Sequence, residues 1–437
     1  MLKTLTYTIP KKGVKINIHA LNKQFKQICI FDSNLQANQN QRLQASKIIA
    51  IGAVQVIETN DSNNTLEELQ QLIDKKKSWL FGYLSYDLKN SIEQLSSENE
   101  DGLGFPLLNF FVPKVVIQMY PNSILVIYDD EHTTKQGAED IYNLSISPSS
   151  PLKGEPLPAN DVVIQSKIEK FEYINSVNQL KQHIHKGDIY EVNFCQEFYA
   201  KNAVINTVEI FEKLNQISEA PFSAYCRFDI HYALCASPER FLQKRANKLI
   251  SQPIKGTIKR STNKTEDEVL KHELKNSNKE RSENVMIVDL VRNDFSRIAK
   301  TGSVKVEELF GIYSFKQLHQ MISTLSCELK NNVNFTDIIK STFPMGSMTG
   351  APKVSALKLI EEYESTKRGL YSGAIGYINP EGDFDFNVVI RSILYNSDNN
   401  YLSFMVGSAI TDKAIAEEEY EECLLKAKAM FEVLKKE

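Results

Sequence analysis

The sequence predicts a mixed fold of helices and strands, either α/β or α+β in class. Short apolar runs at 28–31 and 123–128 have the length and content of β-strands. Apolar residues recur every three or four positions through 174–184 and 420–434, which is the spacing of amphipathic helices. A chain of 437 residues can hold two or three ordinary domains or one large intertwined body.

The composition excludes several classes of partner. Hydrophobic residues make up 42% and charged residues 24%, as in an ordinary soluble globular protein. The net charge of −4 offers no basic surface for nucleic acid, and no apolar run reaches membrane-spanning length. The N-terminus lacks the apolar core of a signal peptide, and six scattered cysteines form no CxxC pair. These features predict a cytoplasmic protein with reduced thiols.

Residues 1–145 are expected to form an N-terminal α/β region, whose densest aromatic patch, at 79–87, is typical of a core strand. A segment rich in proline and serine follows at 146–162, where four prolines exclude a helix interior or a central strand. We interpret it as a linker or loop before a catalytic region at 163–437, although the regions on its two sides could still form one body.

The catalytic region is expected to contain three long helices. The first covers 174–187 and ends near Gly187, because glycine commonly follows the last helical turn. The second and third are expected over 266–299 and 416–435. The segment 387–392 alternates like a strand.

The segment Pro-Ile-Lys-Gly-Thr at 253–257 is the first candidate for chemistry. Its proline restricts the backbone and its glycine permits a turn or a close approach to a ligand. Lys255 has apolar neighbours, and loss of hydration favours the neutral amine, which is a nucleophile. The five residues alone fit a surface lysine on a turn after a strand better than a nucleophile, because so short a motif is weak evidence.

A second candidate is Glu239, which follows an apolar run and the pair Ser237-Pro238. A glutamate in this place is commonly the first residue of a helix. A partly buried carboxyl group, however, has a raised pKa and can hold a proton for donation.

One further segment and one arginine are candidates for binding a ligand. Residues 343–353 hold two glycines and two prolines, which predict a loop that leads into a helix without the spacing of a nucleotide P-loop. Arg391 ends an apolar strand, where it is either an edge charge or a bidentate partner for a carboxylate.

Taken together, five segments resemble those of the chorismate-utilising enzymes, in order and in chemistry: 237–242, 253–257, 283–294, 343–353 and 419–427. The resemblance is strong over about 170–437 and weak over the first 145 residues. It implies an α+β fold, built as a large two-layered antiparallel β-sandwich with outer helices, like that of anthranilate synthase component I. The site is then expected in a cleft.

The resemblance also implies a role for each matching residue. It makes Lys255 the nucleophile, Glu239 the proton donor, and Glu283 and Glu422 the ligands of Mg²⁺, a metal that usually takes one or two protein carboxylates. The implied contacts to substrate are Arg391, Tyr377, Gly407, Lys426, Ser347 and Thr349.

Within the family, the segment around Lys255 is similar to that of the aminodeoxychorismate synthases, whereas anthranilate synthases carry alanine at this position. The implied reaction forms 4-amino-4-deoxychorismate from chorismate and ammonia, on the route to 4-aminobenzoate and folate. The ammonia is expected from a separate glutamine amidotransferase. The alternatives are anthranilate synthase component I and a non-catalytic chorismate-binding subunit.

Two positions and one missing segment depart from the family's pattern. Glu191 stands where the family usually has glutamine and related isomerases have lysine; it could orient water or ammonium, or simply cap a strand. Gln320, not His319, occupies the position of an active-site histidine of anthranilate synthases, so His319 receives no catalytic role. The segment that helps relatives bind regulatory tryptophan is missing.

Overall fold

The structure is a computed structural model that describes residues 1–10, 14–34, 45–60, 65–147 and 162–435. Of the strands in these ranges, 20 join into one antiparallel sheet. A separate two-stranded sheet consists of β2 (Lys15–Ile16) and β8 (Ile146–Ser147).

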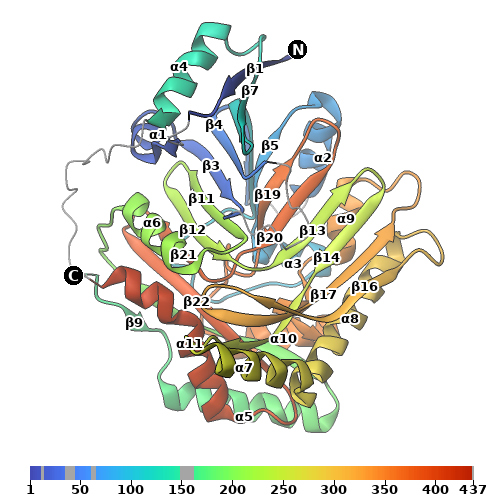
Figure 1. Cartoon of the computed structure of the whole chain (residues 1–437). Coiled ribbons are helices and arrows are strands. Elements are labelled where there is room, and N and C mark those ends of the chain that lie inside the picture. Colours follow the sequence, from blue (N-terminus) through green and yellow to red (C-terminus); the bar gives the residue numbers. More distant parts are fainter. Residues whose placement is uncertain (11–13, 35–44, 61–64, 148–161, 436–437) are drawn as a thin grey trace.

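The large sheet folds into two layers (Figure 1). The layers are joined by the pairing of β4 (Lys47–Thr59) with β6 (Leu108–Met119). From β4, the first layer continues through β3 (Gln27–Asp32), β11 (Phe222–Phe228), β12 (His231–Ser237), β21 (Ser392–Asn396), β22 (Tyr401–Ile410) and β10 (Glu191–Ala200). From β6, the second continues through β5 (Leu80–Leu84), β19 (Ala374–Ile378), β20 (Phe384–Val388), β13 (Arg240–Arg245), β14 (Lys248–Gln252) and β17 (Leu318–Glu328). The edges are completed by β1 (Leu2–Thr8), β7 (Ser123–Asp129), β9 (Gln165–Ser166), β15 (Ile254–Lys259), β16 (Lys305–Ser314) and β18 (Gly350–Ala351).

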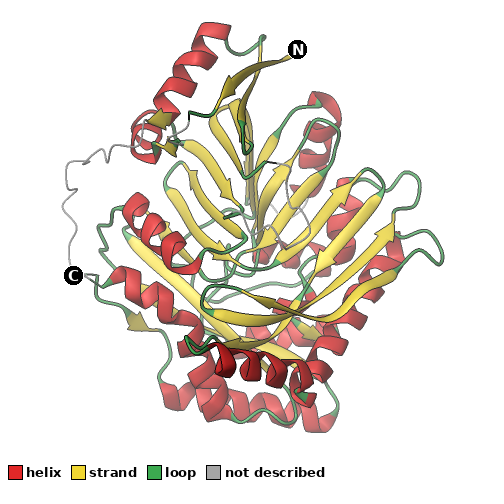
Figure 2. Cartoon of the chain, in the orientation of Figure 1, coloured by secondary structure: helices red, strands yellow, loops and turns green. Residues whose placement is uncertain are grey.

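The helices lie outside the strands (Figure 2). In chain order they are α1 (Ile18–Gln24), α2 (Thr65–Lys76), α3 (Lys89–Glu93), α4 (Lys135–Ser145), α5 (Lys170–Lys186), α6 (Thr207–Ser218), α7 (Lys264–Asn276), α8 (Asn278–Ile298), α9 (Phe335–Thr342), α10 (Lys353–Tyr363) and α11 (Ala416–Leu434). Two short 3₁₀ turns accompany them, η1 (Tyr86–Leu88) and η2 (Gly346–Met348).

The first layer is buried on both faces, which the two-residue period of a strand makes possible. In β3, Phe31 faces the inner core and lies against Phe81 of β5 and Tyr377 of β19. The alternate residues of the same strand, Ile28 and Ile30, face a second core beneath the outer helices. Two apolar cores therefore share this layer. The expected α+β sandwich with antiparallel sheets and outer helices is confirmed.

Three expected elements can be compared with the structure. The first long helix ends as predicted, because Gly187 adopts φ 85° and its amide bonds back to the last turn of α5. The helix expected over 266–299 is instead divided at Ser277, whose extended backbone ends α7 and whose hydroxyl caps α8. The strand expected over 387–392 is also interrupted, since β20 ends at Val388 and β21 begins at Ser392.

The regions on the two sides of the expected linker contribute strands to the same sheet. β3 pairs with β11, and β5 pairs with β19. Most of the linker expected over 146–162 lies outside the described residues, at 148–161. Within the described ranges, no helix combines the length and apolar content needed to cross a membrane.

Candidate active site

A cavity of about 840 Å³, part of it open to solvent, lies between β15, β22, α8 and α11. Its wall contains charged side chains of both signs: Glu239, Lys255, Lys279, Glu280, Glu283, Arg391, Glu419, Glu422 and Lys426. Residues almost 190 positions apart in the sequence thus meet in one place, as the five-segment pattern predicted.

Lys255 lies on β15 and is only 8% exposed. Its ammonium donates a hydrogen bond of 2.6 Å to Oε1 of Glu191, the first residue of β10. Burial opposes the charged form, but the carboxylates of Glu191, Glu283 and Glu422 outweigh it, so the pKa of Lys255 lies above its ordinary value. The expectation of a neutral amine is therefore wrong for this state of the protein. Lys255 must lose a proton before it can act as a nucleophile.

Glu239 lies in the connection between β12 and β13 and is 3% exposed. Its Oε1 accepts a hydrogen bond of 2.6 Å from the hydroxyl of Ser347. Burial raises the pKa of Glu239 to about 7, and the hydrogen bond from Ser347 opposes this rise because it favours the ionised form. A carboxyl group with this pKa is protonated in a large fraction of the molecules near neutral pH. The residue therefore suits proton donation.

Arg391 is half-buried in the segment between β20 and β21 and lines the cavity. Its φ of 51° is uncommon for any residue other than glycine. Burial lowers the pKa of its guanidinium to about 10, while the nearby Glu239 opposes the shift. The guanidinium is charged at neutral pH, and its planar group of donors matches a carboxylate.

Two helices each present a pair of glutamates to the cavity. On α8 these are Glu280 and Glu283, and on α11 they are Glu419 and Glu422. Residues three apart lie on one face of a helix, so each pair points in one direction. The resemblance to the family pointed to only one member of each pair, Glu283 and Glu422.

The described residues around Glu283 suit a hard divalent cation. Burial raises the pKa of Glu283 to about 8, and its Oε1 is buried without a hydrogen-bond partner in the described part of the chain. Glu422 is half-buried on the facing helix, and its pKa is lowered by Lys426, which lies 2.7 Å from it. One unpaired carboxylate oxygen and a second, ionised carboxylate on the same cavity wall form a donor set that Mg²⁺ prefers.

Gly407 and Lys426 form the neighbouring part of the wall. Residues 406–410 lie inside β22. A Cβ atom at Gly407 would approach Sγ of Cys195 to 2.4 Å, which explains why glycine occupies this strand position. The carbonyl of Gly407 accepts a hydrogen bond of 2.9 Å from Lys426, and this contact fixes the lysine at the cavity.

Two expected substrate contacts lie away from the cavity wall. Tyr377 packs among aromatic rings of the inner core, including Trp79 and Phe81. Thr349 is fully buried, and its hydroxyl bonds to the carbonyls of its own turn. The tyrosine that lines the cavity is Tyr371, six residues earlier in the same segment. The sequence contained no signal that separates the two tyrosines.

Arg368 holds part of the wall in place from behind. It is 2% exposed and forms a buried ion pair of 2.6 Å with Glu364. It also donates to the carbonyls of Met348 and Asn193, at 2.7 and 2.9 Å. Both of these residues line the cavity, so Arg368 connects η2 to β10.

We expect Arg368→Met to lower the free energy of unfolding by about 3–5 kcal/mol, because it leaves Glu364 charged and unpaired in the interior. The matched control is Arg292→Met. Arg292 forms an exposed pair of 2.7 Å with Asp289, whose loss should cost less than about 1 kcal/mol. Urea denaturation of both variants tests this expectation. Equal losses would contradict the anchoring role of Arg368.

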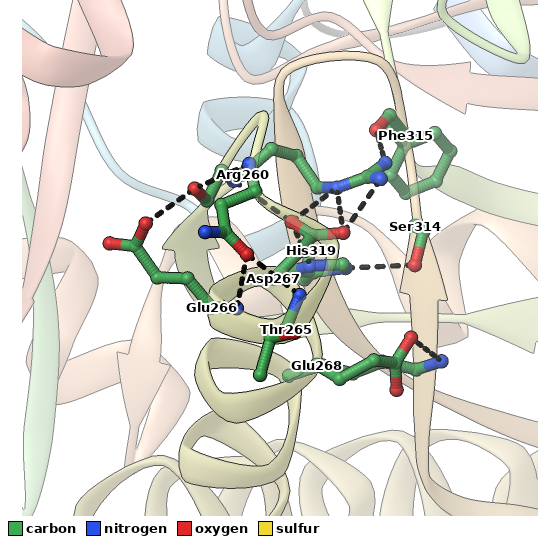
Figure 3. A network of polar contacts seen from close by, with 11 residues as sticks. Arg260, Thr265, Glu266, Asp267, Glu268, Ser314, Phe315 and His319 are labelled. Atoms are coloured by element: carbon green, nitrogen blue, oxygen red, sulfur yellow. Dashed lines mark hydrogen bonds and ion pairs between the residues drawn. The ribbon is translucent and has the colours of Figure 1, made fainter.

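His319 belongs to a separate polar network (Figure 3). Its Nε2 lies 3.0 Å from Asp267 of α7, and its Nδ1 lies 2.8 Å from the hydroxyl of Ser314. Arg260 binds the same aspartate through Nε at 2.9 Å. The network joins the start of α7 to the edge of the sheet and includes no residue that lines the cavity. The next residue along β17, Gln320, does line it.

The family model of the chorismate binding enzymes matches residues 22–432. The chain belongs to this family. Among curated proteins, it is similar to aminodeoxychorismate synthase component 1 of Escherichia coli K12, with 31% identity over 86% of this chain and 84% of that protein. It is also similar to a probable chloroplastic aminodeoxychorismate synthase of rice, with 33% identity over 81% of the chain, although it spans only 43% of that longer protein.

Two solved structures have a similar fold. Anthranilate synthase component I from Streptococcus pneumoniae has a TM-score of 0.78 at 26% identity, with 90% of this chain and 93% of that chain covered. The menaquinone-specific isochorismate synthase of Escherichia coli has a TM-score of 0.77 at 15% identity, with 100% and 95% covered, and this likeness concerns the fold alone.

Proposed function

We propose that the chain is component 1 of an aminodeoxychorismate synthase, which converts chorismate and ammonia to 4-amino-4-deoxychorismate. The observation that carries this proposal is Lys255, buried in the same cavity as the proton donor Glu239. In the family, lysine at this position distinguishes amination at C4 from the anthranilate synthases, which have alanine. The relative from Escherichia coli bears the corresponding name.

In the first step, the free amine of Lys255 forms a bond to C2 of chorismate. The two ring double bonds shift, the C4–O bond breaks, and Glu239 gives its proton to the departing hydroxyl, which leaves as water. Hydroxide is a poor leaving group, so this step needs the raised pKa of Glu239.

In the second step, ammonia adds at C4, the double bonds shift back, and the bond between C2 and Lys255 breaks. The amine of Lys255 takes the electron pair of that bond. The new ammonium at C4 returns a proton to Glu239. The sum of the two steps is chorismate plus ammonia giving 4-amino-4-deoxychorismate plus water.

The remaining charged residues bind and orient the substrate. Glu283 and Glu422 would hold Mg²⁺, which supplies positive charge that offsets a substrate carboxylate. Arg391 and Lys426 donate hydrogen bonds to the substrate's carboxylates and so fix the ring relative to Lys255. A Cβ atom at Gly407 would strike Cys195, so this position of the wall requires glycine.

The ammonia is proposed to come from a separate glutamine amidotransferase. The relatives from Escherichia coli and Bacillus subtilis are each named as component 1, which implies a second component in those enzymes. Free ammonium at high concentration should replace that partner in a test of this chain alone.

Product analysis tests the proposal. The purified chain is incubated with chorismate, Mg²⁺ and ammonium, and the product is identified by mass and by conversion to 4-aminobenzoate with an added lyase. We expect 4-amino-4-deoxychorismate, no product after chelation of the metal, and recovery when Mg²⁺ is restored. Absence of chorismate consumption would favour a non-catalytic chorismate-binding subunit.

The second candidate function is that of anthranilate synthase component I. The chain is 30% identical, over 90% of its length, to anthranilate synthase component 1 of Aquifex aeolicus. The same assay separates the two functions, because anthranilate would form directly, without the added lyase.

A further inference from the structure

We propose that Glu191 is the proton acceptor that converts the ammonium of Lys255 into the nucleophilic amine. This inference rests on the proposed function, because only the reaction through Lys255 requires a free amine there. It gives a role to a residue at which this chain departs from its family.

The geometry of the pair suits direct proton transfer. Oε1 of Glu191 lies 2.6 Å from Nζ of Lys255, which is the distance of a strong, charge-assisted hydrogen bond. Glu191 is 1% exposed and Lys255 8%, so little water reaches either group. The second oxygen of Glu191, Oε2, is buried and has no hydrogen-bond partner among the described residues. The carboxylate therefore has an unused oxygen that could carry a proton.

Two of the other carboxylates near Lys255 are committed elsewhere. Glu239 already accepts from Ser347, and it must be protonated when the hydroxyl of the substrate departs. Glu422 is paired with Lys426. The charged groups whose fields reach Lys255 are Glu191, Glu239, Glu280, Glu283, Glu422 and Lys426. Of the acidic side chains that the structure describes, only Glu191 forms an ion pair with Lys255.

The backbone fixes Glu191 opposite Lys255. Glu191 pairs with Ala351 of β18, and the amide of the preceding Tyr190 donates to the carbonyl of Ala351 at 2.7 Å. A Cβ atom at Gly350 would come within 2.1 Å of the carbonyl oxygen of Glu191, so glycine is needed for this close approach. Lys255 lies between Ile254 and Thr257, which both pair with β17, so strand pairing on each side of Lys255 holds it opposite Glu191.

The proton moves only between Lys255 and Glu191. Lys255 gives one proton to Glu191 and becomes the amine that attacks C2. When the amine leaves C2 in the second step, Glu191 returns the proton and the ammonium forms again. No proton has to enter from solvent or leave to it during this exchange.

Glu191→Gln tests the inference, because it keeps the shape of the side chain and removes the acceptor. We expect kcat/KM for 4-amino-4-deoxychorismate formation to fall about 100-fold at neutral pH. The deficit should shrink as pH rises, since Lys255 then loses its proton to water. Glu191→Asp should restore part of the activity at neutral pH. The matched control is Glu197→Gln on the same strand, another buried glutamate with an unpartnered oxygen that does not line the cavity.

The outcomes separate the inference from the proposed function. Wild-type kcat/KM at neutral pH in Glu191→Gln would overturn the role of Glu191 and leave the reaction intact. A loss of equal size at every pH would also overturn it, since damage to the structure does not depend on the charge of Lys255. If the wild-type chain forms no 4-amino-4-deoxychorismate, the proposed function fails, and the inference fails with it.

Discussion

Lys255→Ala is expected to lower the rate of 4-amino-4-deoxychorismate formation by at least about 1,000-fold. The variant removes the only group in the proposed reaction that forms a bond to C2. Ammonia can then reach C2 itself, which corresponds to the reaction of relatives with alanine at this position. The assay should therefore measure two products, 4-amino-4-deoxychorismate and the product aminated at C2.

A covalent intermediate gives this prediction a second measurement. Without ammonium, the wild-type chain incubated with chorismate and Mg²⁺ should gain the mass of chorismate less water. The matched control is Lys259→Ala, because Lys259 is an exposed lysine on the same strand. The control should keep both the adduct and the activity. Full amination at C4 by Lys255→Ala would contradict covalent catalysis by this residue.

The position of Lys255 could be predicted from the sequence, but its charge could not. The apolar neighbours of Lys255 in the chain indicated a dehydrated, neutral amine. Its charge is set instead by Glu191, 64 residues earlier, and by Glu283 and Glu422 on two helices. These carboxylates reach Lys255 only through the pairing of strands and the packing of α8 and α11, which no local pattern reveals.

Most residues of the cavity wall could be predicted from the five segments that resemble the family. Ser347 and Lys426 fall in two of the five segments that resemble the family, and both line the cavity. Tyr371 and Tyr377 are six residues apart, and which of them faces the cavity depends on where β19 begins. Element boundaries of this kind are set by tertiary contacts and are therefore the least predictable part of a sequence.

The two pairs of glutamates, one on α8 and one on α11, show how more of the cavity-lining residues could have been predicted from the sequence. Glu280 precedes Glu283 by three residues, and Glu419 precedes Glu422 by three. Once one member of a pair is assigned to a site, the helical period places the other on the same face. This rule applies even though Ser277 divides the helix that was expected to be continuous, because both glutamates of α8 follow the break.

Glu239→Gln is expected to lower kcat/KM by about 100- to 10,000-fold, the usual range for loss of a general acid. The amide keeps the size of the side chain and can still accept the hydrogen bond from Ser347, but it has no acidic proton for the hydroxyl at C4. Steady-state rates with saturating ammonium measure this loss. A Glu239→Gln variant with wild-type rates would show that another group protonates the hydroxyl.

The pH dependence of kcat/KM in the wild-type chain also tests Glu239 as the proton donor, and its direction can be predicted. Glu239 must be protonated to act, and burial raises its pKa to about 7, so kcat/KM should fall as pH rises through that value. Ser347→Ala removes a hydrogen bond that favours the ionised form, and the pKa of Glu239 should therefore rise further. The alkaline limb of the profile should move to higher pH in Ser347→Ala and disappear in Glu239→Gln. A shift to lower pH in Ser347→Ala would be incompatible with Glu239 as the donor, because loss of that hydrogen bond can only favour the protonated carboxyl.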